Sequence, residues 1–166
     1  MDPYAPTPDR KGLLRKGLLV VLIIVAAGAG YGFYLFNLPH RDVQSTAADA
    51  SISSTELVNE YLNDAAGANA KYLNEEGESK VLSITGTVAS IETDLKGQVV
   101  VKLMEPKAKA GVRCSFTMET NAHTDHLKLG ENVTLKGVIR AGAGYDADLE
   151  LFEDAVLEKC SIATNN

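Results

Sequence analysis

The sequence predicts a mainly β protein with helices: a five-stranded barrel preceded by an amphipathic helix and by an apolar N-terminal helix. The first observation behind this is the stretch 81–91, in which Leu82, Ile84 and Val88 alternate with small polar side chains as in a strand. Gly86 lies inside it, where a strand bends or admits another backbone. The second observation is that four more segments follow, up to residue 162, in which apolar and polar side chains alternate as in strands. A bent first strand can serve two sheets, which favours a closed barrel.

Composition limits what such a domain does. The 166 residues are enough for one domain with an appendage and too few for two full domains. A net charge of -6 and a pI near 5.1 give the whole chain no general attraction to nucleic acid or to anionic lipid. Two cysteines, Cys114 and Cys160, are too few for a zinc site or a disulfide-dense scaffold.

The N-terminal third predicts a membrane anchor. Residues 17–36 form an almost uninterrupted apolar run of about 20 residues, the length of a transmembrane helix. The preceding tail, 1–16, carries the basic residues Arg10, Lys11, Arg15 and Lys16, which places it in the cytoplasm. Residues 37–52 are expected to be a linker and 53–166 an extracytoplasmic domain, periplasmic in a Gram-negative cell. The expected localisation is therefore the cell membrane, in a single pass.

Two alternatives concern this segment. Ala27-Gly28-Ala29 has the small-x-small pattern of a signal-peptidase site, although the apolar run continues through an aromatic cluster after it. Cleavage and anchoring both export the domain. Gly28 and Gly32 form a Gly-xxx-Gly pair, through which two such helices can associate as a homodimer.

A helix is expected at residues 53–74. Ser53 and Glu56 have the spacing of a capping box, and Gly77 follows the last periodic residue. The apolar face predicts that this helix packs on the barrel.

The remaining strands are separated by recognisable turns. Asp94-Leu-Lys-Gly97 is a turn, so 81–91 and 98–103 form a hairpin. Further strands are expected at 112–116, at 130–140 around Gly137, and within 149–162, most clearly at 155–160. The stretch 117–129 is expected to be irregular or briefly helical, and 141–148 to be a flexible loop.

This order of elements resembles the OB-fold, a five-stranded Greek-key barrel. The helix ending in Lys71-Tyr72, the segment 84–88, Cys114-Ser-Phe116, the glycine-led stretch 130–137 and Leu157-Glu-Lys-Cys160 resemble the bacterial tRNA_anti-like family of OB-fold domains. The similarity covers roughly the last two-thirds of the chain. It implies an OB-fold that is membrane-anchored, and it implies no established activity.

The resemblance also relates the two cysteines. Cys114 is expected on the third barrel strand and Cys160 at the end of the fifth, and these strands are neighbours in an OB barrel. An exported domain permits a disulfide between them. The alternative is a pair of buried free thiols.

Several residues are candidates for a site. Lys102 and Arg113 project outward from adjacent strands and, with Tyr145, are the ligand-binding candidates. His123 and His126, with Asp125, have the composition of a weak metal site, although no third ligand is confirmed. No cofactor and no catalytic residue are expected.

The function favoured by the sequence is a membrane-anchored, extracytoplasmic binding or adaptor module for a protein, peptide or saccharide. A nucleic-acid-binding OB domain is the alternative, and a metal-dependent enzyme is a third possibility. From Gly77 onward there are ten Lys or Arg against thirteen Asp or Glu, and only three aromatic residues, which disfavours nucleic acid.

Overall fold

The structure is a computed structural model that describes residues 10–36, 43–74 and 79–163. The chain divides into two compact units, Met1–Arg41 and Asp42–Asn166, which are described separately.

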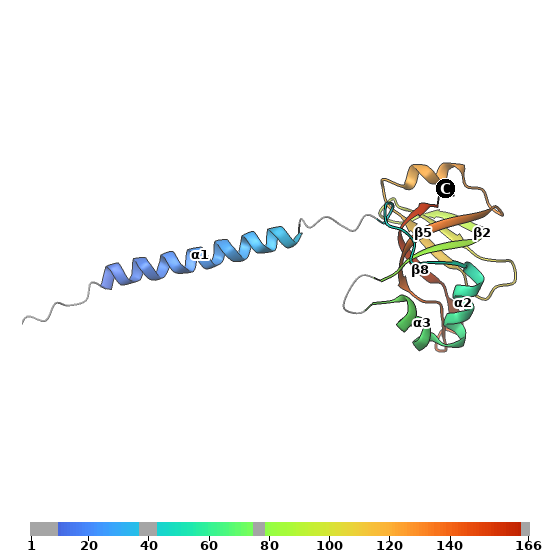
Figure 1. Ribbon diagram of the computed structural model, residues 1–166, viewed down its shortest axis with the longest axis horizontal. Helices are drawn as coiled ribbons and strands as arrows, with labels where there is room; N and C mark the ends of the chain where they lie inside the picture. Colours follow the sequence, from blue (N-terminus) through green and yellow to red (C-terminus); the bar gives the residue numbers. More distant parts are fainter. Residues whose placement is uncertain (1–9, 37–42, 75–78, 164–166) are drawn as a thin grey trace, which may run out of the picture. The chain divides into compact units, whose positions relative to one another are not determined.

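The first unit contains helix α1, Arg10–Phe36 (Figure 1). At 27 residues it is longer than the apolar run from which a helix was expected. Its large side chains between Val20 and Tyr34 are exposed, with Phe33 at 72%. Among the residues that the structure describes, no helix has both the length and the apolar character needed to cross a membrane.

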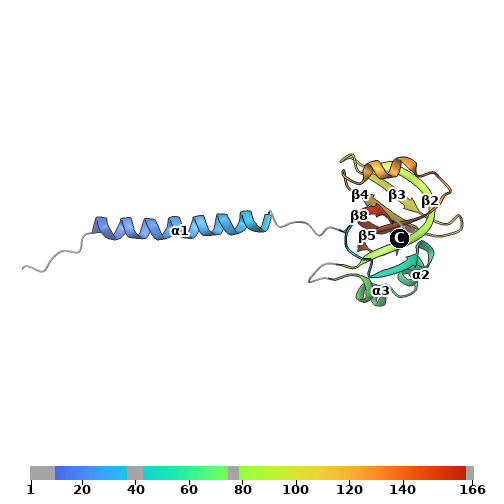
Figure 2. The same cartoon turned by 45° about the horizontal axis from the view of Figure 1, so that its top comes forward.

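The second unit is the predicted barrel (Figures 1 and 2). Its five strands are β2 (Val81–Thr93), β3 (Val99–Leu103), β4 (Val112–Phe116), β5 (Asn132–Ala141) and β8 (Ala155–Ile162). They pair in the order β2-β3-β4-β8-β5, and β5 returns to pair with β2, which closes the barrel. The β4–β8 pair is parallel, whereas β2–β3, β3–β4, β5–β8 and β2–β5 are antiparallel.

Strand β2 serves two sheets, as expected. Residues 81–87 pair with β5, and residues 88–93 pair with β3. The register shifts between Val88 and Ser90, so the irregularity lies beyond Gly86, which pairs regularly with Val133. A Cβ on Gly86 would lie 2.5 Å from Ser54 Oγ, so this glycine is required by the close approach of a helix rather than by a bend.

The alternation of side chains assigned the core correctly. Ile84, Val101, Leu135 and Leu157 all point into the barrel and are 0% exposed. A smaller apolar cluster of Val43, Val81 and Val138 packs on the outside of β2 and β5.

The expected amphipathic helix is two helices. Helix α2 covers Ser54–Asn63 and α3 covers Ala65–Tyr72. Asp64 separates them, because it ends α2 and its side chain then accepts a hydrogen bond from Gly67 N at 2.9 Å, which starts α3. These helices lie at one end of the barrel, and the 3-10 helix η1, Asn121–His126, lies at the other (Figures 1 and 2).

Three short strands were not expected. Strand β1, Ala50–Ser53, pairs in parallel with β2 and comes from the end of the stretch expected to be a linker. Strands β6, Gly144–Asp146, and β7, Leu151–Glu153, form a separate hairpin in the connection before β8. This hairpin overlaps the stretch that was expected to be a flexible loop.

Candidate ligand-binding groove

The outer face of β3 and β4 contains the two cationic candidates. Lys102 and Arg113 are directly opposite each other in the register. Lys102 Nζ lies 2.8 Å from Asp154 Oδ2, so its charge is compensated, whereas Arg113 is exposed and has no ion pair with a described residue. The other outward positions of these two strands are Val100 and Ser115, so this face has no aromatic side chain.

A groove of about 590 Å³ lies elsewhere on the domain, against α2. Its three walls are α2, the β3–β4 connection and the β6–β7 hairpin. The lining residues are Thr55, Val58, Asn59, Leu62 and Asn63 from α2; Glu105, Lys107, Ala108 and Lys109 from the connection; and Tyr145 and Phe152 from the hairpin. We call this the α2 groove.

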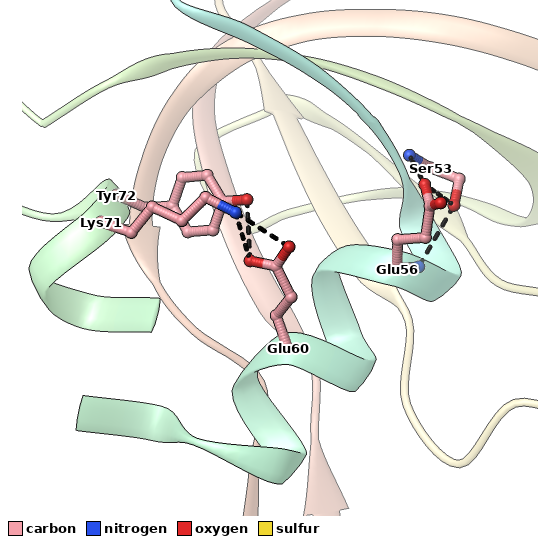
Figure 3. Close-up of polar contacts among 5 residues, drawn as sticks. All are labelled: Ser53, Glu56, Glu60, Lys71 and Tyr72. Carbon is pink, nitrogen blue, oxygen red and sulfur yellow. Dashed lines mark hydrogen bonds and ion pairs between the residues drawn. The ribbon is translucent and has the colours of Figure 1, made fainter. Parts of the chain in front are cut away.

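The helical wall is placed by local sequence signals. Ser53 Oγ accepts a hydrogen bond from Glu56 N at 3.2 Å, and the Glu56 carboxylate accepts from Ser53 N at 3.1 Å, so the predicted capping box is confirmed (Figure 3). Thr55, Asn59 and Asn63 recur every four residues, so they form one polar stripe along the groove.

The acidic residues of α2 are used outside the groove. Glu60 accepts hydrogen bonds from Lys71 Nζ at 2.8 and 2.9 Å and from Tyr72 Oη at 2.9 Å, which ties α2 to α3 (Figure 3). The hydrogen bond from Lys71 holds the pKa of Glu60 below its ordinary value. The wall that α2 contributes to the groove is therefore uncharged.

The hairpin wall presents two aromatic rings. Tyr145 and Phe152 are opposite each other in the β6–β7 register, with ring centroids 4.8 Å apart. Tyr145 is 55% exposed. The turn between the strands is held by Asp146, whose Oδ1 accepts from Asp148 N at 2.8 Å and from Leu149 N at 3.0 Å.

The third wall is basic. Lys109 Nζ lies 5.2 Å from the centroid of the Phe152 ring, a cation–π contact. Neither Lys107 nor Lys109 forms an ion pair with a described residue. The one carboxylate of the lining, Glu105, accepts a hydrogen bond from Thr87 Oγ1 at 2.7 Å.

A second groove, of about 550 Å³, contains the histidine candidates. His123 and His126 of η1 line it together with Gln44, Lys136 and the end of β8. Lys136 Nζ is engaged there by the carbonyl oxygens of Gln44 at 2.7 Å and Thr46 at 3.1 Å. Among the described residues, no three His, Cys, Asp or Glu side chains gather to form a metal site.

The expected disulfide is wrong. Cys114 and Cys160 are both buried free thiols, although their strands are neighbours as expected. Cys114 pairs with Leu157, and Cys160 pairs with Phe116, so the two cysteines are diagonal to each other. The register of this parallel pair shifts between Cys114 and Phe116, and the two thiols contact each other through a hydrogen bond rather than a covalent bond. Burial and the hydrogen bond from Cys114 raise the pKa of the Cys160 thiol.

Sequence reasoning placed one residue of the α2 groove, Tyr145, among its candidates and missed the rest. The signal for Asn59 and Asn63 was present, because polar residues recur every four positions beside the apolar stripe of the helix. No such signal exists for Lys107 and Lys109, since their position depends on how the β3–β4 connection meets a helix some 50 residues earlier in the chain.

The barrel is closed, and its first strand is shared by two sheets. Its third and fifth strands, β4 and β8, pair in parallel, and a short helix follows the third strand. These features define an OB-fold domain. The tRNA_anti-like family model matches residues 13–155. The chain belongs to this family.

A comparison with curated proteins found no match. Among solved structures, one match is the crystal structure of a candidate nucleic acid-binding lipoprotein from Klebsiella pneumoniae subsp. pneumoniae MGH 78578. It is 15% identical, and the alignment covers 76% of this chain and 100% of that chain with a TM-score of 0.48.

Proposed function

We propose that this protein is a membrane-anchored, extracytoplasmic binding module whose ligand site is the α2 groove. The observation that carries this proposal is the aromatic pair of the exposed Tyr145 and the half-buried Phe152. It lies in a concave site with two lysines that form no ion pair with a described residue on one side and neutral hydrogen-bonding groups on the other. A concave site lined by apolar surface with a few well-placed polar groups is typical of ligand recognition. The barrel serves as the rigid support for these three walls.

Anchoring through α1 is part of the proposal. A 27-residue helix is about 40 Å long, which exceeds the hydrocarbon thickness of about 30 Å. The family match begins at residue 13, inside α1, so the helix belongs to the region that the family model covers. The basic residues lie before the apolar run, which favours a cytoplasmic N-terminus and an exported barrel.

The partner of a binding module of this kind is a protein, a peptide or a saccharide. A nucleic acid is the second candidate, favoured by the adjacent Lys102 and Arg113 on the β3–β4 face where OB-folds bind oligonucleotides. Against it, Lys102 is paired with Asp154, and that face lacks the aromatic side chains on which bases stack.

Site-specific photocrosslinking in cells tests the proposal. A photoreactive phenylalanine derivative replaces Asn63 in the α2 groove, Arg113 on the barrel face, or Leu95 at the β2–β3 turn as an exposed control. We expect a discrete adduct from position 63 alone. An adduct from position 113 without one from position 63 would move the ligand site to the barrel face, and a gel-shift assay with oligo(dT) at low and high salt would then test nucleic acid.

A further inference from the structure

We propose that the α2 groove selects an acidic saccharide, with a uronic-acid type carboxylate facing Lys107 and Lys109 and a sugar ring stacked on Tyr145. This inference rests on the proposed function, because it names the ligand class of the same site. It depends on how charge, aromatic surface and hydrogen-bonding groups are distributed among the three walls.

The charges of the groove favour an anionic ligand. The chain has a net charge of -6, yet the lining contains two lysines and one carboxylate. That carboxylate, Glu105, is held by Thr87 Oγ1. A cationic site on an acidic protein attracts anions locally while the rest of the surface repels them.

Neighbouring acids do not compensate the two lysines. Asp154 is paired with Lys102 and accepts a hydrogen bond from Gly111 N at 2.7 Å. Glu153 lies next to Phe152 on a strand, so it belongs to the opposite face of the hairpin. Asp146 caps its own turn.

The uncharged wall favours hydroxyl and amide groups on the ligand. Asn59 and Asn63 each offer a donor and an acceptor, and Thr55 adds a hydroxyl. Vicinal hydroxyls and N-acetyl groups of sugars also donate and accept, so they match this stripe. The flat apolar face of a pyranose ring suits the exposed ring of Tyr145 on the hairpin wall.

The walls fit a peptide or a nucleic acid less well. The hairpin faces the groove with the side chains of Tyr145 and Phe152 rather than with a strand edge, so a peptide cannot extend its sheet there. Single-stranded nucleic acid needs a basic groove that follows many phosphates. Two lysines supply too little positive charge for a chain of phosphates, but they suffice for the single carboxylate of one uronic acid unit.

The test uses the full chain in detergent micelles and isothermal titration calorimetry. The probes are a hyaluronate tetrasaccharide and tetragalacturonate, each beside its carboxyl-reduced counterpart. We expect an acidic form to bind at least tenfold more tightly than its reduced form, a difference of about 1.4 kcal/mol. The double variant Lys107→Ala/Lys109→Ala should lose this preference, whereas Lys96→Ala/Lys128→Ala, which removes two exposed lysines elsewhere, should keep it.

The variant Tyr145→Ala distinguishes two hypotheses: that the ligand is an acidic saccharide, and that the α2 groove is where the ligand binds. We expect it to weaken the acidic and the reduced forms by similar factors. If Tyr145→Ala weakens binding but both forms bind equally well, the groove stands and the acidic class is overturned. If neither Tyr145→Ala nor the double lysine variant changes binding, the groove itself is overturned.

Two further results would overturn the acidic saccharide. One is that none of the four oligosaccharides shows saturable binding below about 1 mM, the affinity of a weak contact of about 4 kcal/mol. The other is that oligo(dT), or an acidic peptide, binds more tightly than the acidic oligosaccharides do and that the double lysine variant loses this binding.

Discussion

Tyr61 of α2 and Tyr72 of α3 pack against each other and differ in how their hydroxyl groups are bonded. The ring centroids of Tyr61 and Tyr72 lie 6.2 Å apart. Tyr72 donates to Glu60, whereas the buried hydroxyl of Tyr61 has no hydrogen-bond partner among the described residues. Burial raises the pKa of Tyr61 to about 12, so its hydroxyl stays neutral at physiological pH.

This difference predicts opposite effects of the same substitution. Tyr61→Phe removes an unpaired buried group and should raise the free energy of unfolding by about 1 kcal/mol. Tyr72→Phe removes a hydrogen bond to a carboxylate and should lower it by about 1 kcal/mol. Urea denaturation of the two variants measures both values, and a loss of stability in Tyr61→Phe would show that its hydroxyl is bonded.

Strand β5 allows a test of side-chain direction with two adjacent residues. Leu135 is 0% exposed, so Leu135→Ala should lower the free energy of unfolding by roughly 2 to 5 kcal/mol. Thr134, next to it, faces outward and bonds Thr85 across the strands at 2.9 Å, so Thr134→Ala should cost about 0.5 to 1 kcal/mol. Equal losses in denaturation experiments would contradict the register of β5.

At the scale of elements, the contact between α2 and α3 predicts a dependence on pH. The pKa of Glu60 is lower in the folded state than in the unfolded state. The ionised carboxylate therefore adds to the free energy of unfolding above the unfolded pKa near 4.5, and this stabilisation is lost as the pH falls through the folded pKa. Glu60→Gln should therefore lower the thermal unfolding midpoint at pH 6 and have a smaller effect at pH 3. The effect is modest because the pair is partly exposed to solvent.

A matched variant shows whether this effect belongs to the pair. Glu119→Gln removes an exposed carboxylate outside the two helices and should show no such pH-dependent difference from the parent protein. A constant effect of Glu60→Gln from pH 3 to pH 6 would mean that the carboxylate charge of Glu60 does not hold the two helices together.

The pairing of β4 with β8 predicts the behaviour of the cysteines. Both thiols are buried, and the raised pKa of Cys160 suppresses its thiolate, so the folded protein should react slowly with maleimide at pH 7. The unfolded protein should expose two reactive thiols without any reductant. Mass spectrometry counts the labels, and a thiol that becomes reactive only after reduction would indicate a bond that the structure does not contain.

At the scale of the whole molecule, the proposed anchoring predicts a single topology. The basic residues before the apolar run favour a cytoplasmic N-terminus, so a reporter fused after Asn166 should give an extracytoplasmic signal. Replacing Arg10, Lys11, Arg15 and Lys16 by Ala should reduce that signal, since they determine the orientation. A cytoplasmic signal from the unchanged chain would contradict the proposed export.

At the same scale, the surface of the barrel bears on the nucleic-acid alternative. On the outer face, Lys102 is paired with Asp154 and Arg140 with Glu158 at 2.9 Å. These pairs compensate Lys102 and Arg140, whereas Arg113 stays exposed without an ion pair to a described residue. The exposed aromatic surface lies instead on the β6–β7 hairpin, which extends one connection of the barrel toward α2.

The sequence by itself determined the barrel and its core. Alternation of apolar side chains depends only on the geometry of a strand, so Ile84, Val101, Leu135 and Leu157 could be assigned to the interior without knowing their neighbours. The capping box at Ser53 was equally local, because its hydrogen bonds join residues three positions apart.

Only the tertiary structure decided the candidate site and the state of the cysteines. The α2 groove joins residues 55–63, 105–109 and 145–152, and no local pattern specifies that these three segments meet. The disulfide failed for a similar reason: neighbouring strands could be inferred, but their register could not. The β4–β8 register, with its shift between Cys114 and Phe116, decides how the two side chains face each other, and that register is set by how the whole barrel closes.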